Sequence, residues 1–383
     1  MNKPIYLDYM ATTPVDPRVI KKMWPYLENF FGNPASKHFY GCQTKTAIEE
    51  ARNQVASLIN CNPKNIIWTS GATEANNLAI KGAVLFYKRQ GKHIVTCQTE
   101  HKSVLDTCKF LETQQGFDIT YLAPESDGLI DLEKLKKALR QDTILLSIMH
   151  VNNEIGVIQD IANISEITHS RGILFHVDSA QGAGKIPINL QKLKIDLMSF
   201  SAHKVYGPKG VGALYIRSNP QLHLVPQIHG GSQENNLRAG TLAPHQIVGM
   251  GEAFHIAQQE IATESKRLLS LRERFVYGIK NLGDIYINGS LKNRIPGNLN
   301  LSFAKVKGEI LLAALKDLAI STTSACIKDN SEPSYVLWAI GVPDQLITSS
   351  FRLSIGRFTT IKEIDFAIKH ISEVVTKLRK EIP

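Results

Sequence analysis

The hydrophobic pattern of the first two thirds of the chain alternates between short apolar runs and longer amphipathic stretches. Short runs rich in β-branched residues predict strands, whereas apolar residues spaced three and four apart predict helices. This alternation is typical of a mainly parallel sheet with helices on both faces. The expected strands are 66–69, 93–96, 143–150, 174–177, 195–200 and 211–216, and the expected helices are 18–27, 43–59, 74–89, 102–114 and 161–171.

The rhythm changes after a long amphipathic helix expected over 253–282. We therefore predict two domains, a large one of residues 15–256 and a smaller α+β one formed by residues 1–14 and 257–383. The chain has 383 residues, 43% of them hydrophobic, which is enough for two cores. The second domain is expected to hold strands over 298–303, 320–324 and 351–355 and helices over 308–316 and 361–380.

Charge and cysteine content exclude several classes of protein. The net charge is +9, but no basic run stands out, so direct nucleic-acid binding is not expected. No apolar run is long enough to span a membrane, and the first residues lack the apolar core of a signal peptide, so we expect a cytoplasmic protein. Five dispersed cysteines without a CxxC motif argue against a disulfide framework and against a zinc site.

The most informative stretch is Ser201-Ala-His-Lys204, which follows a short apolar run and precedes a glycine-rich loop. Ligands of open α/β folds bind at the carboxyl edge of the sheet, where such a strand ends. Burial disfavours a charged lysine, and a neutral amine forms Schiff bases with carbonyl compounds such as pyridoxal phosphate. A lysine that only carries surface charge is the alternative when Lys204 is considered alone.

Asp178 ends the preceding predicted strand, where an unpaired carboxylate is costly. In pyridoxal enzymes an acidic group pairs with the pyridinium nitrogen and makes the ring an electron sink. Asp178 and Lys204 end successive strand units, which suits one ligand lying across the sheet edge, and Gln181 could reach the phenolic oxygen of the same ring. An ordinary buried ion pair is the alternative for Asp178.

Four other positions have polar groups suited to a bound anion or ring. The turn at Ser70-Gly-Ala-Thr-Glu74 offers backbone N–H groups and the Thr73 hydroxyl at a helix start, although an ordinary cap is the alternative. His101 could stack on a flat ring or act in proton transfer, or could be structural. Asn153 and Arg352 suit a carboxylate, although Asn153 could simply cap a turn.

Taken in order along the chain, these motifs resemble the cysteine desulfurases, which are fold-type I pyridoxal phosphate enzymes of the class V aminotransferase group. The resemblance covers nearly the whole chain and is closest to the housekeeping iron–sulfur-cluster subgroup. It rests on Gly71-Ala-Thr73, Glu100-His101, Asn152-Asn-Glu154, Val177-Asp-Ser-Ala-Gln181, Ser201-Ala-His-Lys204, Arg238-Ala-Gly-Thr241 and Ser324-Ala-Cys326.

The resemblance implies a role for each site residue. Lys204 would hold pyridoxal 5'-phosphate as a Schiff base and move the substrate proton, while His101 would stack on the ring and assist in acid–base steps. Asp178 and Gln181 would tune the ring. The phosphate would be held by Thr73, Ser201 and His203, with Thr241 supplied by the second subunit of a homodimer. Ala72 and Asn153 would also contact the cofactor, and the substrate carboxylate would be bound by Asn153 and Arg352.

The resemblance also implies sulfur transfer through Cys326, which lies in a polar stretch beside Lys328. L-Cysteine would become L-alanine, leaving a persulfide on Cys326 for an acceptor protein, either a cluster scaffold or a carrier for tRNA thiolation. Two positions depart from the usual pattern, because Thr323 replaces a glycine and Ile327 replaces a small hydroxyl residue. The sequence given ends at Pro383, without the C-terminal extension that helps housekeeping desulfurases dock their scaffold.

Two other functions are compatible with the same residues. One is selenocysteine lyase or another class V activity, since cleavage at selenium can proceed without the cysteine. The other is a non-catalytic sulfur-relay subunit on the same fold, against which Lys204, Asp178 and His101 argue. An inert cysteine is the alternative for Cys326 itself.

Overall fold

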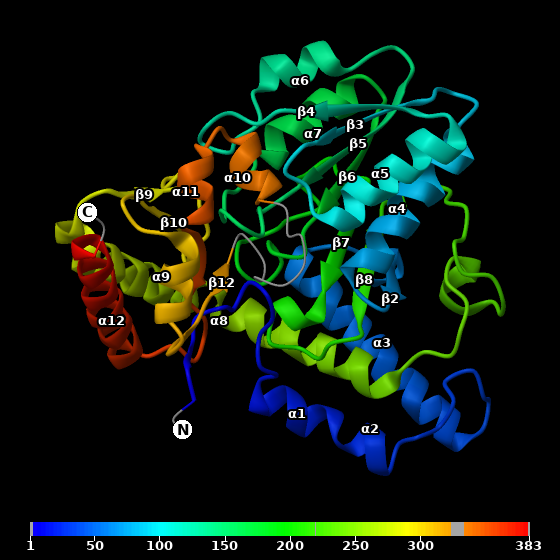
Figure 1. Cartoon of the computed structure of the whole chain (residues 1–383). Helices are drawn as coiled ribbons and strands as arrows, with labels where there is room; N and C mark the ends of the chain where they lie inside the picture. Colours follow the sequence, from blue (N-terminus) through cyan, green and yellow to red (C-terminus); the bar gives the residue numbers. More distant parts are fainter. Residues whose placement is uncertain (1–2, 219, 323–332, 382–383) are drawn as a thin grey trace.

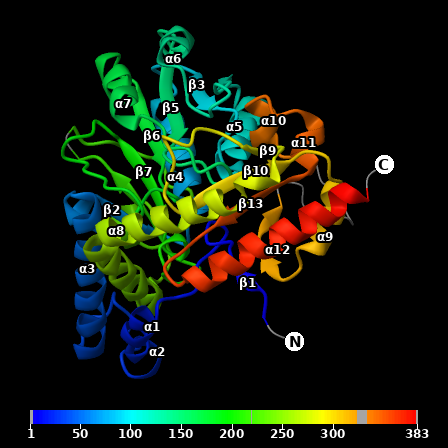
Figure 2. The same cartoon turned by 90° about the vertical axis from the view of Figure 1, so that its left-hand side faces the viewer.

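The structure, a computed structural model, describes residues 3–218, 220–322 and 333–381 of the chain. These residues form two layered parts that share the long helix α8 (Pro244–Ile279). The larger part is built on a seven-stranded sheet and the smaller part on a four-stranded sheet (Figure 1). Figure 2 shows α8 extending from beside α3 toward β9 and β10, so one helix contributes to both parts.

The seven-stranded sheet has the order β2-β8-β7-β6-β5-β3-β4. Neighbouring strands among β4, β3, β5, β6 and β7 pair in parallel, whereas β8 is antiparallel to both of its neighbours, β7 and β2. The mainly parallel sheet expected from the alternating pattern is therefore confirmed. Its strands are β2 (Ile66–Thr69), β3 (His93–Cys97), β4 (Asp118–Leu122), β5 (Thr143–Met149), β6 (Leu174–Asp178), β7 (Leu197–Ser201) and β8 (Gly212–Ile216).

Helices cover both faces of this sheet. Successive residues of a strand point to opposite faces, and apolar residues on each face pack against helices. In β2, Ile66 and Trp68 join a core with residues of α3, α7 and α8, while Ile67 joins a second core with residues of α4. The helices of the larger part are α1 (Pro17–Met23), α2 (Pro25–Glu28), α3 (Phe39–Ile59), α4 (Ala72–Tyr87), α5 (Lys102–Gln115), α6 (Leu132–Ala138) and α7 (Ile161–Ser170).

The smaller part is an antiparallel sheet of order β12-β13-β10-β9 packed against helices. Phe303 and Phe351 stack with ring centroids 5.2 Å apart, in a core that also contains Phe275 of α8 and Ile371 of α12. A short parallel pair, β1 with β11, holds the N-terminal arm, residues 3–16 before α1, on this part. The elements are β1 (Ile5–Tyr6), β9 (Ile285–Ile287), β10 (Asn298–Phe303), β11 (Leu318–Ala319), β12 (Ser321–Thr322), β13 (Ser350–Ser354), α9 (Gly308–Ala314), α10 (Tyr335–Ala339), α11 (Asp344–Thr348) and α12 (Ile361–Lys380).

Some predicted boundaries are wrong. The helix predicted over 18–27 is split into α1 and α2, because Pro25 has no N–H to continue the hydrogen-bond ladder. The pattern also missed the edge strand β4 and the two-turn helix α6, and it began α8 too late. The predicted domain boundary after residue 256 falls inside α8, and the division into domains stays a prediction.

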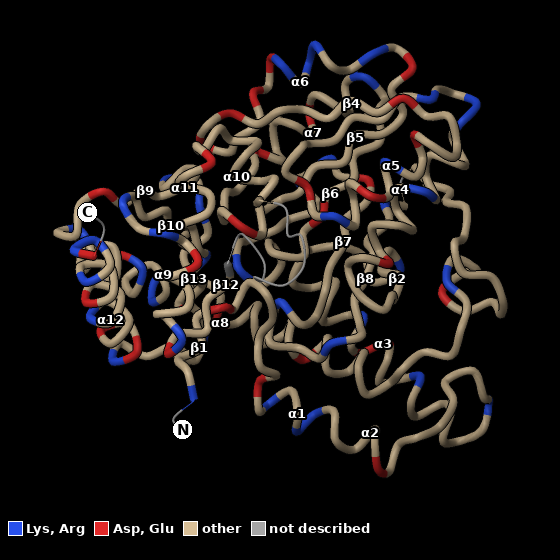
Figure 3. The backbone as a smooth tube through the Cα atoms, in the orientation of Figure 1, with Lys and Arg blue, Asp and Glu red and all other residues tan. Residues whose placement is uncertain are grey.

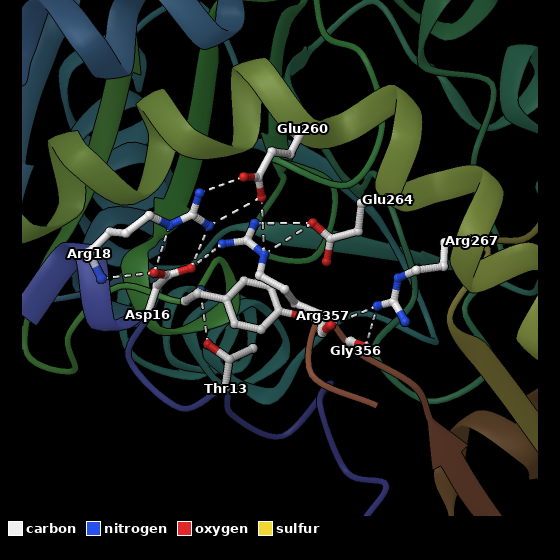
Figure 4. Close-up of polar contacts among 9 residues, drawn as sticks. Thr13, Asp16, Arg18, Glu260, Glu264, Arg267, Gly356 and Arg357 are labelled. Atoms are coloured by element: carbon white, nitrogen blue, oxygen red, sulfur yellow. Dashed lines mark hydrogen bonds and ion pairs between the residues drawn. The ribbon is translucent and has the colours of Figure 1, made fainter. Parts of the chain in front are cut away.

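A cluster of ion pairs fastens the arm to the rest of the molecule (Figure 4). The Asp16 carboxylate, which is 2% exposed, accepts hydrogen bonds from Arg18 Nε at 3.0 Å and from Arg357 Nη1 at 2.8 Å. Arg357 also donates to Glu264 of α8, at 3.0 Å from Nη2. The cluster therefore joins the arm, α8 and the segment that follows β13.

Charged residues are spread over both parts rather than gathered on one element (Figure 3). This distribution agrees with the absence of a basic run in the sequence. Within residues 3–218, 220–322 and 333–381, no helix is both long enough and apolar enough to cross a lipid bilayer.

Candidate active site

A cavity of about 560 Å³ lies at the carboxyl edge of the seven-stranded sheet, next to β13 of the smaller part. Its walls come from the turns that follow β2, β3, β5, β6 and β7, from the N-terminal arm and from β13. It is lined by nearly all the residues that the sequence predicted to form a site: Ala72, Thr73, His101, Asn153, Asp178, Gln181, Ser201, His203, Lys204 and Arg352.

Close backbone packing holds the turn that follows β2 against β8, which is the neighbour of β7 in the sheet. A Cβ atom on Gly212 of β8 would lie 2.6 Å from Gly71 Cα and 2.4 Å from the Phe200 carbonyl oxygen, so only glycine fits there. The turn after β2 therefore sits directly against β8, and α4 begins at Ala72 beside the cavity. The N–H groups at the start of this helix and the Thr73 side chain are placed to bind an anion.

Lys204 closes the short 3₁₀ turn Ala202–Lys204 that follows β7. Its Nζ donates to two carbonyl oxygens of the arm, those of Met10 at 3.0 Å and Ala11 at 2.6 Å. Burial, and then the nearby Arg352 guanidinium, lowers the pKa of Lys204 to about 8. A substantial fraction of the amine is thus neutral near physiological pH, as nucleophilic attack on a carbonyl requires.

Asp178 ends β6 and is held in place by two donors. Its Oδ1 accepts from the Ala180 backbone N–H at 3.0 Å, and its Oδ2 accepts from Asn76 Nδ2 at 2.8 Å. Asn76 is fully buried on α4, one turn after Thr73. Sequence reasoning missed Asn76, although its spacing of three residues from Thr73 puts both on one helix face.

Asn76 also links Asp178 to His101. Its Nδ2 lies 2.8 Å from Ser103 Oγ, which in turn lies 2.8 Å from His101 Nδ1. The Ser103 backbone N–H donates to His101 Nδ1 at 3.1 Å, so the neutral ring carries its proton on Nε2. The orientation of the imidazole and that of the Asp178 carboxylate are therefore set by one hydrogen-bonded chain.

The arm also contacts the two remaining polar groups near Lys204. His203 Nδ1 lies 3.0 Å from Thr12 Oγ1, and burial lowers the pKa of His203 to about 4, which keeps the ring neutral. Gln181 Nε2 donates to the Met10 carbonyl at 2.8 Å. The contribution of the arm was not predicted, because apart from Thr12 these contacts use the backbone carbonyl groups of Met10 and Ala11, which carry no sequence signal.

Arg352 reaches the cavity from the middle of β13. Its Nη1 donates to the Asn153 carbonyl at 2.6 Å and its Nη2 to Asp8 Oδ1 at 2.7 Å. Its Nε and the Asn153 Oδ1 are buried without a hydrogen-bond partner among the described residues. Because a guanidinium has five N–H donors, Arg352 keeps donors for a carboxylate in the cavity.

Thr241 and Cys326 are the two predicted site residues that remain. Thr241 lines a different cavity, together with Asn33, Pro34 and Ala35. Cys326, with the neighbouring positions 323 and 327, lies outside the described residues.

Residues 5–366 match the protein family described as Aminotransferase class-V. The protein named cysteine desulfurase IscS of Proteus mirabilis is 58% identical over 386 aligned residues, which span 100% of this chain and 95% of that protein. This chain belongs to the cysteine desulfurases of the aminotransferase class-V family. The desulfurase of the same name from Pseudomonas aeruginosa PAO1 is also 58% identical over 100% of the chain and 95% of its own length.

Solved structures show the same relationship for this desulfurase. A NifS-like protein superposes with a TM-score of 0.92 at 37% identity, covering 98% of this chain and all of the other. The structure described as SspA in complex with cysteine superposes with a TM-score of 0.83 at 37% identity, covering 93% and 100%. The resemblance found in the sequence is therefore confirmed, and the desulfurase is a pyridoxal phosphate-dependent enzyme.

The cavity of this desulfurase fits that cofactor. Asp178 offers a fixed carboxylate for the pyridinium nitrogen, and Lys204 offers an amine for the aldehyde. The start of α4 with Thr73, together with Ser201 and neutral His203, offers donors for the phosphate group. These groups line one cavity, as the alternating pattern of strands and helices predicted.

Proposed function

We propose that this desulfurase converts L-cysteine to L-alanine and transfers the sulfur to Cys326 as a persulfide. The observation that carries the proposal is Lys204, an amine with a lowered pKa that shares one cavity with the fixed carboxylate of Asp178. Bound pyridoxal phosphate supplies an electron sink next to the substrate Cα. The remaining chemistry belongs to side chains of this chain.

We infer the following roles for the residues of the cavity. Lys204 would anchor the cofactor through its amine, and its Nζ would carry the proton removed from the substrate Cα. Asp178 keeps the pyridine nitrogen protonated, and His101, oriented through Ser103, stacks on the ring with its Nε2–H directed into the cavity. Gln181 donates to the phenolic oxygen. Ala72, Thr73, Ser201 and His203 bind the phosphate.

The substrate carboxylate is assigned to Arg352 and Asn153. Arg352 is held in place by Asp8 and by the Asn153 carbonyl, so its guanidinium plane is fixed before substrate arrives. A planar fork of donors recognises a carboxylate with two parallel hydrogen bonds. This arrangement supports an α-amino acid as the substrate class.

Cys326 receives the sulfur in this proposal and passes it to an acceptor protein. The acceptor is a scaffold for iron–sulfur clusters, the process to which the similar desulfurases point, or a carrier for tRNA thiolation. A cytoplasmic location is part of the proposal. It fits the four described cysteines, which are all free, since disulfides are rare in the cytosol.

We propose a homodimer in which Thr241 of each subunit completes the phosphate site of its partner subunit. Thr241 lies away from the cavity of its own chain, beside the loop that contains Asn33. Near that loop Phe31 and Phe39 are 72% and 73% exposed, and Phe31 stacks on Tyr40. Large exposed aromatic groups of this kind mark protein interfaces.

The proposal is tested with purified enzyme loaded with the cofactor and given L-cysteine. With dithiothreitol present to reduce the persulfide, alanine and sulfide are expected in equal amounts. Without this reductant, a persulfide is expected on Cys326 by mass spectrometry. Cys326→Ala should keep the visible absorption of the bound cofactor but lose turnover. Turnover of this variant at the wild-type rate would refute the role of Cys326, and a wild-type enzyme without cysteine turnover would refute the function.

A further inference from the structure

Lys185 lies in the tight turn that follows β6, four residues after Gln181. The turn is fixed by hydrogen bonds from the backbone N–H groups of Lys185 and Ile186 to the Gly182 carbonyl, both of 3.1 Å. Gly184 has a φ of +71°, and a Cβ there would lie 2.4 Å from Val205 Cγ1. The turn therefore requires glycine at 184 and directs the Lys185 side chain back toward Gln181.

The Lys185 amine makes one specific contact. Its Nζ donates to Gln181 Oε1 at 2.5 Å. Lys185 does not line the cavity that contains Asp178, but it lines a second, smaller cavity of about 40 Å³ behind Lys204. Lys185 thus supports Gln181 from behind the site rather than facing a molecule bound in it.

This contact fixes which end of the Gln181 amide faces which neighbour. With Oε1 on Lys185, Nε2 donates one hydrogen to the Met10 carbonyl at 2.8 Å and keeps its second hydrogen for the cavity that Gln181 lines. A flipped amide would place its NH₂ group against the Lys185 amine and its oxygen against the Met10 carbonyl. Lys185 and Met10 therefore make Gln181 a donor toward the cavity.

We propose that Lys185 is a positioning residue that holds Gln181 as a hydrogen-bond donor to the phenolic oxygen of the bound cofactor. The inference rests on the proposed function, in which Gln181 contacts that oxygen. It adds a residue that acts only through Gln181 and that sequence motifs did not indicate.

The surroundings of Lys185 disfavour the protonated form of its amine. Burial lowers the pKa of Lys185 to about 7, and the positive charges of Lys204 and Arg352 act in the same direction. Glu264 of α8 opposes them. Lys185 is partly buried, and its contact with Gln181 is made at a position that disfavours the charged form of the amine.

The test compares Lys185→Met and Lys185→Arg in the cofactor-loaded enzyme. The readout is the midpoint of the pH titration of the bound cofactor's visible absorption, measured without substrate. Loss of a donor at the phenolic oxygen and of a nearby cation both favour the protonated form, so Lys185→Met should raise the midpoint by roughly one pH unit. Lys185→Arg keeps donor and charge and should stay near the wild-type midpoint. Lys194→Met, which removes an exposed partner of Glu166, is the matched control and should change nothing.

A double variant separates positioning from a simple charge effect. In a Gln181→Met background, Lys185→Met should add little further shift if Lys185 acts through Gln181. An equal shift in both backgrounds would overturn the positioning role, as would a Lys185→Met enzyme with the wild-type midpoint. If Lys185→Met does not fold, Lys185→Leu, which also has neither a charge nor a hydrogen-bond donor, gives the same test.

The proposed function is judged separately from this inference. Wild-type enzyme that binds the cofactor and turns over cysteine, together with an unshifted Lys185→Met enzyme, would refute only the role of Lys185. Wild-type enzyme without cysteine turnover would refute the proposed function itself.

Discussion

The seven-stranded sheet and the four-stranded sheet supply the same cavity in different ways. The large sheet contributes residues at the ends of its strands or just after them. Asp178 is the last residue of β6, and Lys204 lies in the turn after β7. The small sheet contributes Arg352 from the middle of β13, where it pairs with Asn300 of β10 and Ser321 of β12. Residues beyond a strand are held by turns and neighbouring loops, whereas Arg352 is held by strand pairing on both sides.

The two sheets therefore have different proposed roles, cofactor chemistry for the large sheet and substrate binding for the small one. The turns of the large sheet surround the place proposed for the cofactor, and their side chains are linked to one another, as Asp178, Asn76 and His101 show. Arg352 donates to the Asn153 carbonyl of the large part and to Asp8 of the arm. We therefore expect changes in the large part to affect chemistry and changes in the small part to affect substrate binding.

The largest effect is expected from Lys204→Ala. The variant loses both the amine that anchors the cofactor and the group proposed to move the substrate proton. Loss of a positioned proton-transfer group alone costs roughly 10²- to 10⁴-fold in rate, so kcat for alanine formation should fall by at least that factor. Stopped-time alanine assays measure it. Retention of more than a tenth of the wild-type kcat would break the assignment of chemistry to the large sheet.

A smaller loss is expected from Asp178→Asn, which keeps the shape of the side chain and the space around Asn76. The pyridine nitrogen would lose its anionic partner, and removal of one preorganised electrostatic group costs roughly 10²- to 10³-fold in kcat. The cofactor should still be anchored, so its visible absorption should persist. A variant with unchanged kcat would show that Asp178 serves only in a structural ion pair.

Arg352→Gln sharpens the comparison from the side of the small sheet. Hydrogen bonds to a charged group contribute about 1.5–3 kcal/mol, so KM for L-cysteine should rise about 10- to 150-fold while kcat changes less. Steady-state kinetics separate the two constants, and the circular dichroism spectrum of the variant checks its folding. A fall in kcat with unchanged KM would contradict a role in carboxylate binding.

The smallest effect comes from pH acting on Lys204 in enzyme stripped of its cofactor. The neutral amine is the reactive form, and its pKa is about 8. The rate of cofactor capture should therefore rise about tenfold per pH unit below that value and level off above it. The visible absorption that develops on adding pyridoxal phosphate measures this rate. A profile that kept rising to pH 10 would indicate an amine with an ordinary pKa.

The sequence predicted the large-sheet half of the site well, because strands that run in parallel place their carboxyl ends at one edge. Asp178, Ser201 and Lys204 could be brought together from the alternating pattern alone. Arg352 could be related to them only through the family resemblance, since nothing in a short antiparallel strand indicates which neighbour it faces. The boundaries at Pro25 and Pro244 were less accurate, because the apolar spacing was followed across the first proline and only from well after the second. Both prolines stand in the first turn of a helix, which is a local signal.

Side-chain supports were harder to predict than the groups they support. Asn76 and Lys185 lie close in sequence to predicted residues, yet their roles depend on a helix face and on a turn with Gly184 in a left-handed conformation. The carbonyl groups of Met10 and Ala11 could not be predicted at all, because a backbone acceptor is the same in every residue. The Thr241 assignment to a partner subunit stays a prediction.

The arm has a consequence for the order in which the enzyme becomes active after synthesis. Asp8 leaves the ribosome 344 residues before its partner Arg352. Asp16 likewise pairs with Arg357, which is added 341 residues later. The large sheet can fold while the chain is still being made, but Lys204 gains its final surroundings only after Arg352 has been added. Nascent chains should therefore acquire their sheet before they can process cysteine.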